Sequence, residues 1–145
     1  MIASGEGLGN SFWIAQAADL QASGTDVRAY AVDACSGSEP RDGLLLLHSI
    51  DENGVQEAEV INRDGSDGGV CLNGLRVLAI WSGQERGVFA MAGKHIPWTR
   101  ISEEVELHLP ASSLSSSFWS PTPVKVEGRD AYSVEFWNPH CVIPV

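Results

Sequence analysis

The chain has 145 residues, of which 43% are hydrophobic and 19% are charged, so it is long enough to bury the core of one domain. Nineteen acidic residues against nine basic ones give a formal net charge of −10. This charge argues against nucleic acid as a partner, because phosphate backbones are bound by basic surfaces. A solvated acidic surface that favours solubility is the simpler interpretation.

The sequence has no segment typical of a membrane span or a secretory signal. The aliphatic runs 44–47 and 77–80 are far too short to cross a bilayer, and the first residues lack a basic region followed by an apolar run. Cys35, Cys71 and Cys141 are odd in number and widely spaced, which favours reduced thiols over disulfides or a zinc site. We therefore expect a cytoplasmic protein that has no membrane contact and binds no metal.

The chain pattern predicts many short strands and one helix. Residues 12–15 form the first predicted strand, 16–24 a variable segment and 33–41 a loop rich in Ser, Gly and Pro. Asn53-Gly54 predicts the turn of a hairpin, and 110–123 is a polar loop. The remaining predicted strands are 27–32, 44–50 and 57–61 (the hairpin), 88–92, 95–99, 105–109, 124–126, 132–137 and 141–145. One helix among many strands favours an α+β fold with a sheet wrapped around that helix.

Residues 62–76, Asn-Arg-Asp-Gly-Ser-Asp-Gly-Gly-Val-Cys-Leu-Asn-Gly-Leu-Arg, place Cys71 between a glycine-rich loop and a helix predicted over 72–81. Leu75 and Leu78 lie on one apolar face of this helix. Its other faces are also largely apolar, which indicates a buried helix. A helix start has unpaired N–H groups and a partial positive charge, which lower a thiol pKa and hold a carboxylate. We therefore expect Cys71 to be the most reactive thiol; a buried structural cysteine is the alternative.

Three further segments accompany this one in a fixed order. They are Gly-Leu-Gly-Asn-Ser-Phe at 7–12, Arg-Asp-Gly-Leu-Leu-Leu-Leu at 41–47 and Asn-Pro-His-Cys-Val-Ile at 138–143. Together with 62–76, the set resembles the amino-terminal half of diaminopimelate epimerase. The resemblance implies one lobe of that family's bilobal α+β fold, a curled, mostly antiparallel sheet around a central helix. Residues 1–145 are thus expected to form a single lobe, with the second lobe absent from this chain.

The resemblance also implies an activity, that of a cofactor-independent amino-acid epimerase or racemase of lysine and peptidoglycan precursor biosynthesis. In this family the site lies between the lobes, and each lobe contributes one cysteine. By resemblance, Cys71 is one of the two acid/base thiols and His140 lies close to them as a further catalytic residue. The implied partners are an amino-acid substrate and a second lobe or a second copy of the chain, without a cofactor. The implied substrate contacts are Asn10, Asn62, Asn73, Gly74 and Asn138.

Several of these residues also have a purely structural interpretation. Asn10 could simply belong to a Gly-x-Gly-Asn turn, and Asn62 could stabilise the turn that follows it. Pro139, between Asn138 and His140, could mark a break in a strand. The other histidines lie in predicted strands without ligand spacing, and we interpret them as structural or surface residues.

Two departures from the family pattern bear on function. Leu72 stands where the family usually has glycine, whose missing side chain lets substrate and backbone approach closely. Residues 38–41, Ser-Glu-Pro-Arg, replace a glycine-rich turn. Leu72 is expected to crowd the carboxylate or to change the start of the helix.

Epimerisation needs one group to remove the α-proton and another, on the opposite face, to return one. A single lobe supplies only half of this pair, so we expect the isolated chain to be inactive. Three hypotheses remain open: a lobe that works with a second lobe, two copies that present their Cys71 thiols to each other across a two-fold axis, and a non-catalytic binding or structural half-domain.

Overall fold

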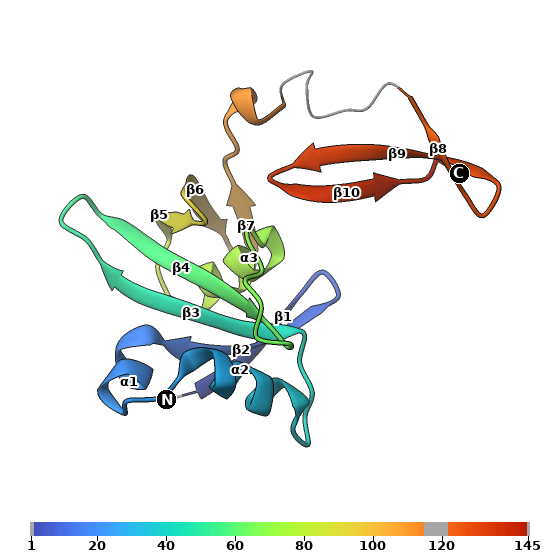
Figure 1. Ribbon diagram of the computed structural model, residues 1–145. Helices are drawn as coiled ribbons and strands as arrows, with labels where there is room; N and C mark the ends of the chain where they lie inside the picture. Colours follow the sequence, from blue (N-terminus) through green and yellow to red (C-terminus); the bar gives the residue numbers. More distant parts are fainter. Residues whose placement is uncertain (1, 115–121, 145) are drawn as a thin grey trace. The chain divides into compact units, whose positions relative to one another are not determined.

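The computed structural model of the chain describes residues 2–114 and 122–144 (Figure 1). The chain divides into two compact units, Met1–His108 and Leu109–Val145. Each unit is described by itself below.

The first unit is built on one seven-stranded sheet, in which every strand pairs with its neighbours in sequence (Figure 1). Two neighbouring pairs, β2–β3 and β4–β5, are parallel and the others are antiparallel. The sheet is curled, so the predicted α+β class with a curled, mostly antiparallel sheet is confirmed. The strands are β1 (Ile2–Gly7), β2 (Asn10–Gln16), β3 (Gly43–Ile50), β4 (Val55–Asn62), β5 (Arg86–Met91), β6 (Lys94–Ile101) and β7 (Glu104–Leu107).

Helices make the two parallel connections, because parallel neighbours need a crossover rather than a tight turn. Helices α1 (Ala17–Ala22) and α2 (Val27–Ser36) join β2 to β3, and α3 (Leu72–Trp81) joins β4 to β5. The predicted helix over 72–81 is confirmed at both ends. Helix α3 packs against β1, β2, β3, β6 and β7, whereas α1 and α2 pack against β2, β3 and β4. No helix of the described residues is long and apolar enough to cross a bilayer.

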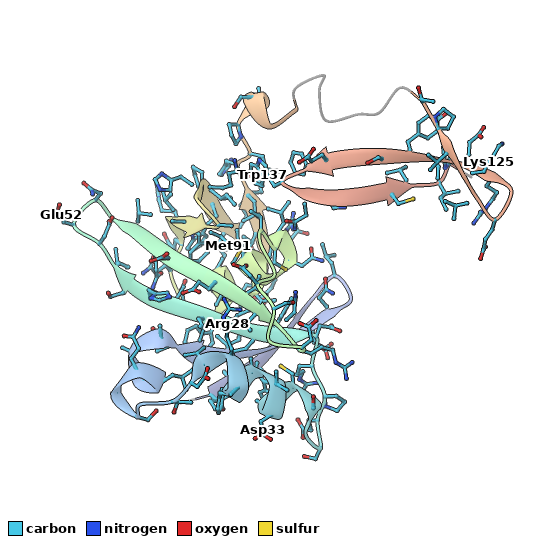
Figure 2. All side chains as sticks on the ribbon, viewed as in Figure 1. Arg28, Asp33, Glu52, Met91, Lys125 and Trp137 are labelled. Carbon is cyan, nitrogen blue, oxygen red and sulfur yellow. The ribbon has the colours of Figure 1, made fainter. Side chains whose placement is uncertain are left out.

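The strand predicted over 27–32 is wrong, because this segment belongs to α2. Asp26 caps the helix: its carboxylate accepts hydrogen bonds from the backbone N–H groups of Arg28 at 3.0 Å and Ala29 at 3.3 Å. Figure 2 shows Asp33 on the side of α2 that points away from the sheet. The segment predicted as variable contains α1, and the loop predicted over 33–41 begins only after α2.

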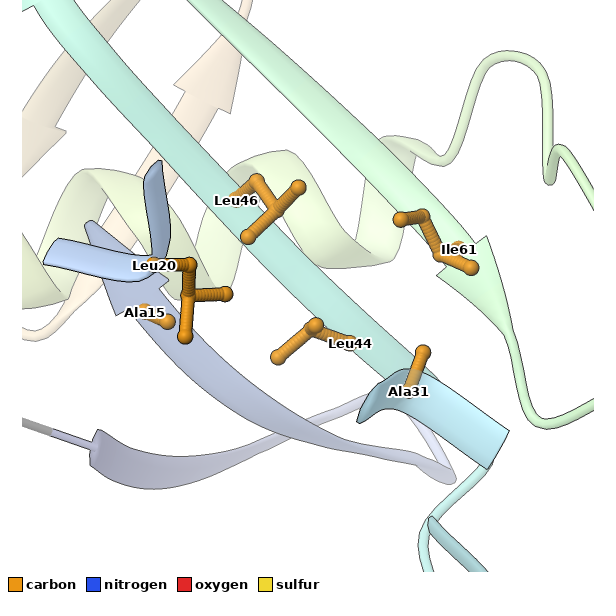
Figure 3. Close-up of a cluster of buried hydrophobic side chains, with 6 residues drawn as sticks. All are labelled: Ala15, Leu20, Ala31, Leu44, Leu46 and Ile61. Carbon is orange, nitrogen blue, oxygen red and sulfur yellow. The ribbon is translucent and has the colours of Figure 1, made fainter. Parts of the chain in front are cut away.

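Residues 43–47 of strand β3 are buried on both faces of the sheet, because helices cover both. Leu44 and Leu46 pack in a cluster with Leu20 of α1 (Figure 3). Leu45 points the other way, since a Cβ added to Gly74 at the start of α3 would come within 2.7 Å of the Leu45 Cδ2 atom. Alternate side chains therefore face two different cores, which explains why the strand reads as an unbroken apolar run.

The second unit contains a three-stranded antiparallel sheet in the order β10-β9-β8. The strands predicted near 124–126 and 132–137 are confirmed, whereas the last strand begins at Asn138 and ends at Val142 rather than spanning 141–145. The Asn-Pro-His segment thus lies in a strand. Of the loop predicted over 110–123, the part at 115–121 lies outside the described residues. The elements are η1 (Ala111–Leu114), β8 (Val124–Val126), β9 (Arg129–Phe136) and β10 (Asn138–Val142).

Candidate functional site

Cys71 occupies the N-cap of α3. Its Sγ atom accepts a hydrogen bond from the backbone N–H of Gly74 at 3.3 Å and a second from the N–H of Asn73. The backbone N–H of Cys71 donates to the thioether sulfur of Met91 at 3.2 Å (Met91 is labelled in Figure 2). The thiol thus takes the place of the oxygen that usually caps a helix. The N–H groups expected to hold a carboxylate point at the sulfur in this structure.

The pKa of the Cys71 thiol is raised, so the prediction of a lowered pKa is wrong. Burial, which disfavours the charged thiolate, is the largest cause. The hydrogen bonds from Gly74 and Asn73 lower the pKa, but by less than burial raises it. Near neutral pH, Cys71 of this chain is therefore mainly a neutral thiol.

Asn10 and Asn73 meet at the start of α3. The Nδ2 atom of Asn73 donates to the Oδ1 atom of Asn10 at 2.9 Å. Gly7 permits this approach, because a Cβ at that position would come within 3.0 Å of the Asn73 carbonyl oxygen. The structure therefore brings together four of the predicted site residues, Asn10, Cys71, Asn73 and Gly74.

Asn62 stands at the end of β4, where it pairs in register with Gly43. Its Nδ2 atom donates to the Ser66 hydroxyl at 2.9 Å and to the Asp67 carbonyl at 3.4 Å. These bonds close the turn after β4, as the structural interpretation of Asn62 requires. A contact between Asn62 and a substrate stays a prediction.

Asn138 and His140 lie on β10 of the second unit. Asn138 pairs in register with Phe136, and His140 pairs with Val134. His140 is exposed in this structure. Their predicted convergence on Cys71 involves both units and stays a prediction.

Asp42 is a site residue to which the sequence analysis assigned no role. Its Oδ2 atom accepts hydrogen bonds from the Ser11 backbone N–H at 2.7 Å and from the Ser11 hydroxyl at 3.2 Å. The Ser11 N–H, followed by the Ser11 hydroxyl, the Asn10 amide and the charge of Arg63, holds the pKa of Asp42 below its usual value against a smaller opposing effect of desolvation. The sequence feature that could have identified Asp42 as a site residue is its position next to Gly43 in the Arg-Asp-Gly segment.

The arrangement at the start of α3 offers one thiol, amide donors and one carboxylate, which suits proton transfer next to a bound anion. Within residues 2–114 and 122–144, no group of His, Cys, Asp and Glu side chains has the arrangement of a metal site. A comparison with protein-family models finds none that matches this chain.

The three cysteines differ in accessibility, and the structure leads us to expect another order of reactivity than the sequence did. Cys141 is exposed, Cys71 is half-buried and Cys35 is fully buried. Burial also raises the pKa of both Cys71 and Cys35, and only the thiolate reacts. We expect iodoacetamide at neutral pH to modify Cys141 first, Cys71 next and Cys35 last, as followed by peptide mapping over time.

The matched control for this labelling is the denatured chain, in which all three cysteines should react at similar rates. The rate at Cys71 should keep rising through the alkaline range, because its pKa is raised. Fastest modification of Cys71 in the folded chain would show instead that its thiol is activated.

Proposed function

We propose that this chain is the thiol-bearing amino-terminal half of a cofactor-independent amino-acid epimerase of the diaminopimelate epimerase kind. One observation carries the proposal: three motif segments far apart in the sequence meet at one end of the sheet. Asp42 bonds to Ser11, Gly43 pairs with Asn62, and Asn73 bonds to Asn10 beside Cys71. Separate motifs that contact one another in the fold, one of them bearing the thiol, are what a shared site requires.

In the proposed reaction, Cys71 exchanges the α-proton of an amino acid whose carboxylate takes over the backbone N–H groups of Asn73 and Gly74, which donate to the thiol in this structure. A second lobe or a second copy of the chain is proposed to complete the site, because epimerisation needs another acid/base group on the opposite face of the α-carbon. His140 and Asn138 are proposed to join the completed site, and the cytoplasm is the proposed location.

The alternative function is a non-catalytic binding or structural half-domain. Two observations favour it: the pKa of Cys71 is raised by burial, and Leu72 stands where glycine would allow close approach of a ligand. In that case the first unit would keep the fold without proton transfer.

The test is α-proton exchange in D2O, followed by proton NMR of 2,6-diaminopimelate. The chain alone is expected to show no exchange, because half a site neither encloses the amino acid nor stabilises the carbanion that is left when the α-proton is removed. A fusion in which the carboxy-terminal lobe of a diaminopimelate epimerase follows residue 145 is expected to exchange the proton. A fusion that melts cooperatively but does not exchange it would favour the non-catalytic alternative.

A further inference from the structure

The two end strands of the seven-stranded sheet, β1 and β7, flank a groove beside helix α3. Strand β1 contributes Gly7, the turn after it contributes Leu8, and β7 contributes Val105. Helix α3 contributes Val77 and Ile80. The groove has a volume of about 330 Å³. We call it the edge groove.

Apolar side chains of the edge groove are left open to solvent. Leu8 is 79% exposed and Ile80 is 44% exposed. Gly5 and Gly7 of β1 face α3, because a Cβ added to them would come within 2.5 Å and 3.0 Å of the Val77 methyl groups. At these two positions β1 has no side chain that could cover the groove.

The outer edge of β1 has unpaired backbone groups. In an antiparallel pair, two residues opposite each other either exchange backbone hydrogen bonds or both direct these groups away. Ser11 of β2 lies opposite Glu6, and its carbonyl accepts from the Asp42 N–H at 2.9 Å, on the side of β3. Glu6 therefore directs its backbone N–H and C=O to the outer edge, and so does Ser4, two residues earlier.

Strand β7 has an outer edge of the same kind. Arg100 of β6 lies opposite Val105, and its N–H donates to the Glu85 carbonyl at 2.7 Å, on the side of β5. Val105 and Leu107 therefore direct their backbone groups away from β6. Among residues 2–114 and 122–144, no strand pairs with either outer edge. The edge groove thus lies between two rows of unpaired donors and acceptors.

The two outer edges suit the same added strand. The chain reverses its direction at the antiparallel pairs β1–β2, β3–β4, β5–β6 and β6–β7, and keeps it at the two parallel pairs. Strands β1 and β7 therefore run the same way through the sheet. A strand in the edge groove can be antiparallel to both, which is the slightly more stable pairing.

The rim of the edge groove is acidic. Glu6, Glu103 and Glu104 line it, and Glu103 lies 3.9 Å from Arg100. Arg76 also lines the groove, but its Nη1 atom donates to a backbone carbonyl of α3 at 3.3 Å. Within the described part of the chain, no cation lies within ion-pair distance of Glu6 or Glu104. Two carboxylates at the rim are thus open to a cationic partner.

The charged and apolar groups of the groove lie on opposite faces of the sheet. Gly5 and Gly7 face α3, so Glu6 between them faces outward. On β7, Glu104 is exposed, whereas Val105 is half-buried. A strand added here would therefore place alternate side chains on the apolar surface of α3 and beside the two carboxylates.

We propose that the edge groove binds an extended segment of a partner polypeptide in which basic residues alternate with apolar ones. The segment adds to the sheet between β1 and β7, with its apolar side chains on Leu8 and Ile80 and its basic side chains beside Glu6 and Glu104. A second copy of this chain is disfavoured as the occupant, because its formal charge is also −10. The proposal does not rest on the proposed function, because none of its contacts involves Cys71.

Hydrogen exchange of the ¹⁵N-labelled chain, followed by NMR, tests the added strand. The probe is the acetylated and amidated peptide Lys-Val-Lys-Val-Lys-Val-Lys, at an ionic strength of about 0.15 M. The outward amides of Glu6 and Val105 should exchange fast in the free chain and about tenfold or more slowly with saturating peptide. The amides of Gly5 and Glu106, which point to the neighbouring strands, should keep their exchange rates.

Two control peptides separate strand addition from attraction to an acidic protein. Lys-Lys-Lys-Lys-Val-Val-Val has the same composition and charge without the alternation, and Glu-Val-Glu-Val-Glu-Val-Glu has the alternation with the opposite charge. Neither should protect the outward amides. Equal protection by either control, or none by the basic alternating peptide, would overturn the proposal. Protection of Glu6 and Val105 that grows with the concentration of the free chain would also overturn it, because a second copy would then be the occupant.

The variant Val105→Pro tests the backbone pairing. It removes an N–H that points away from β6, and proline is tolerated at such positions of edge strands. Peptide affinity, measured by the same NMR titration, should fall by about tenfold, the worth of one hydrogen bond. Unchanged affinity in a folded variant would overturn the proposal.

A charge variant decides the matter even if the proline variant does not fold. Glu6→Gln combined with Glu104→Gln should weaken peptide binding by about three- to tenfold, the worth of two exposed ion pairs. Glu52→Gln combined with Glu57→Gln is the matched control, because it changes the net charge equally in the β3–β4 hairpin and should leave the affinity unchanged. Equal losses in the two double variants, or no loss in either, would overturn the proposal.

Discussion

Replacement of Leu78 by alanine is expected to lower the free energy of unfolding by about 2–5 kcal/mol. Leu78 is 0% exposed and lies on α3, the helix that packs against five strands of the sheet. Removing its side chain leaves a cavity between the helix and the curled sheet that the surrounding strands fill only in part. Urea denaturation followed by tryptophan fluorescence measures the loss, because Trp98 is buried in the same unit.

Ile80→Ala is the matched control for this substitution. Ile80 lies on the same helix but is 44% exposed, beside Leu8 and Val105. Its replacement removes an aliphatic side chain of the same size and should cost less than about 1 kcal/mol, as is usual for surface positions. Similar losses for the two variants would mean that α3 is not the centre of the fold.

The elements that the sequence predicts best are those with local signals. Helix α3 has a glycine-rich loop before it and Gly83 after it, with φ +71°. The hairpin between β3 and β4 has Asn53-Gly54, where Gly54 adopts φ +78° and Asp51 accepts bonds from the Asn53 and Val55 N–H groups. Such signals depend only on residues close in sequence, so pattern analysis finds them.

Helix α2 could not be predicted in this way, because tertiary packing decides its structure. Only Ala31 and Cys35 are buried along it, and two small residues make a weak helical signal. The alternation of residues 27–32 resembles a strand. The parallel pairing of β2 with β3, which the pattern does not show, needs a crossover, and the helix supplies it. The cap by Asp26 is a local signal that the sequence analysis missed.

In the candidate site too, the features set by local sequence could be predicted, and those set by tertiary packing could not. The motif at 62–76 placed Cys71 and Asn73 at a helix start, because a cap is a local feature. The pKa of Cys71 depends on which residues cover its sulfur. Its position at a helix start predicted a lowered pKa, whereas burial raises it. The role of Asp42 depends on Ser11, 31 residues earlier in the chain, so it appears only when β2 and β3 lie side by side.

Cys71→Ser in the fused two-lobe protein is expected to lower the rate of α-proton exchange by a factor of about 100 to 10,000, the usual contribution of a general acid or base. Serine is among the preferred N-cap residues, so its hydroxyl should accept the Gly74 N–H bond that the thiol accepts now. The fold should therefore be kept while the proton-accepting group is lost, since a hydroxyl gives up its proton far less readily than a thiol.

Cys141→Ser is the control, because Cys141 is an exposed thiol of the second unit and should leave the exchange rate unchanged. Thermal unfolding of both variants separates chemistry from folding: a Cys71→Ser protein that melts like its parent but does not exchange the proton has lost only the base. Exchange at the parental rate in that variant would show that another group removes the proton. Cys71 would then be a capping residue alone, as its hydrogen bonds from Asn73 and Gly74 already allow.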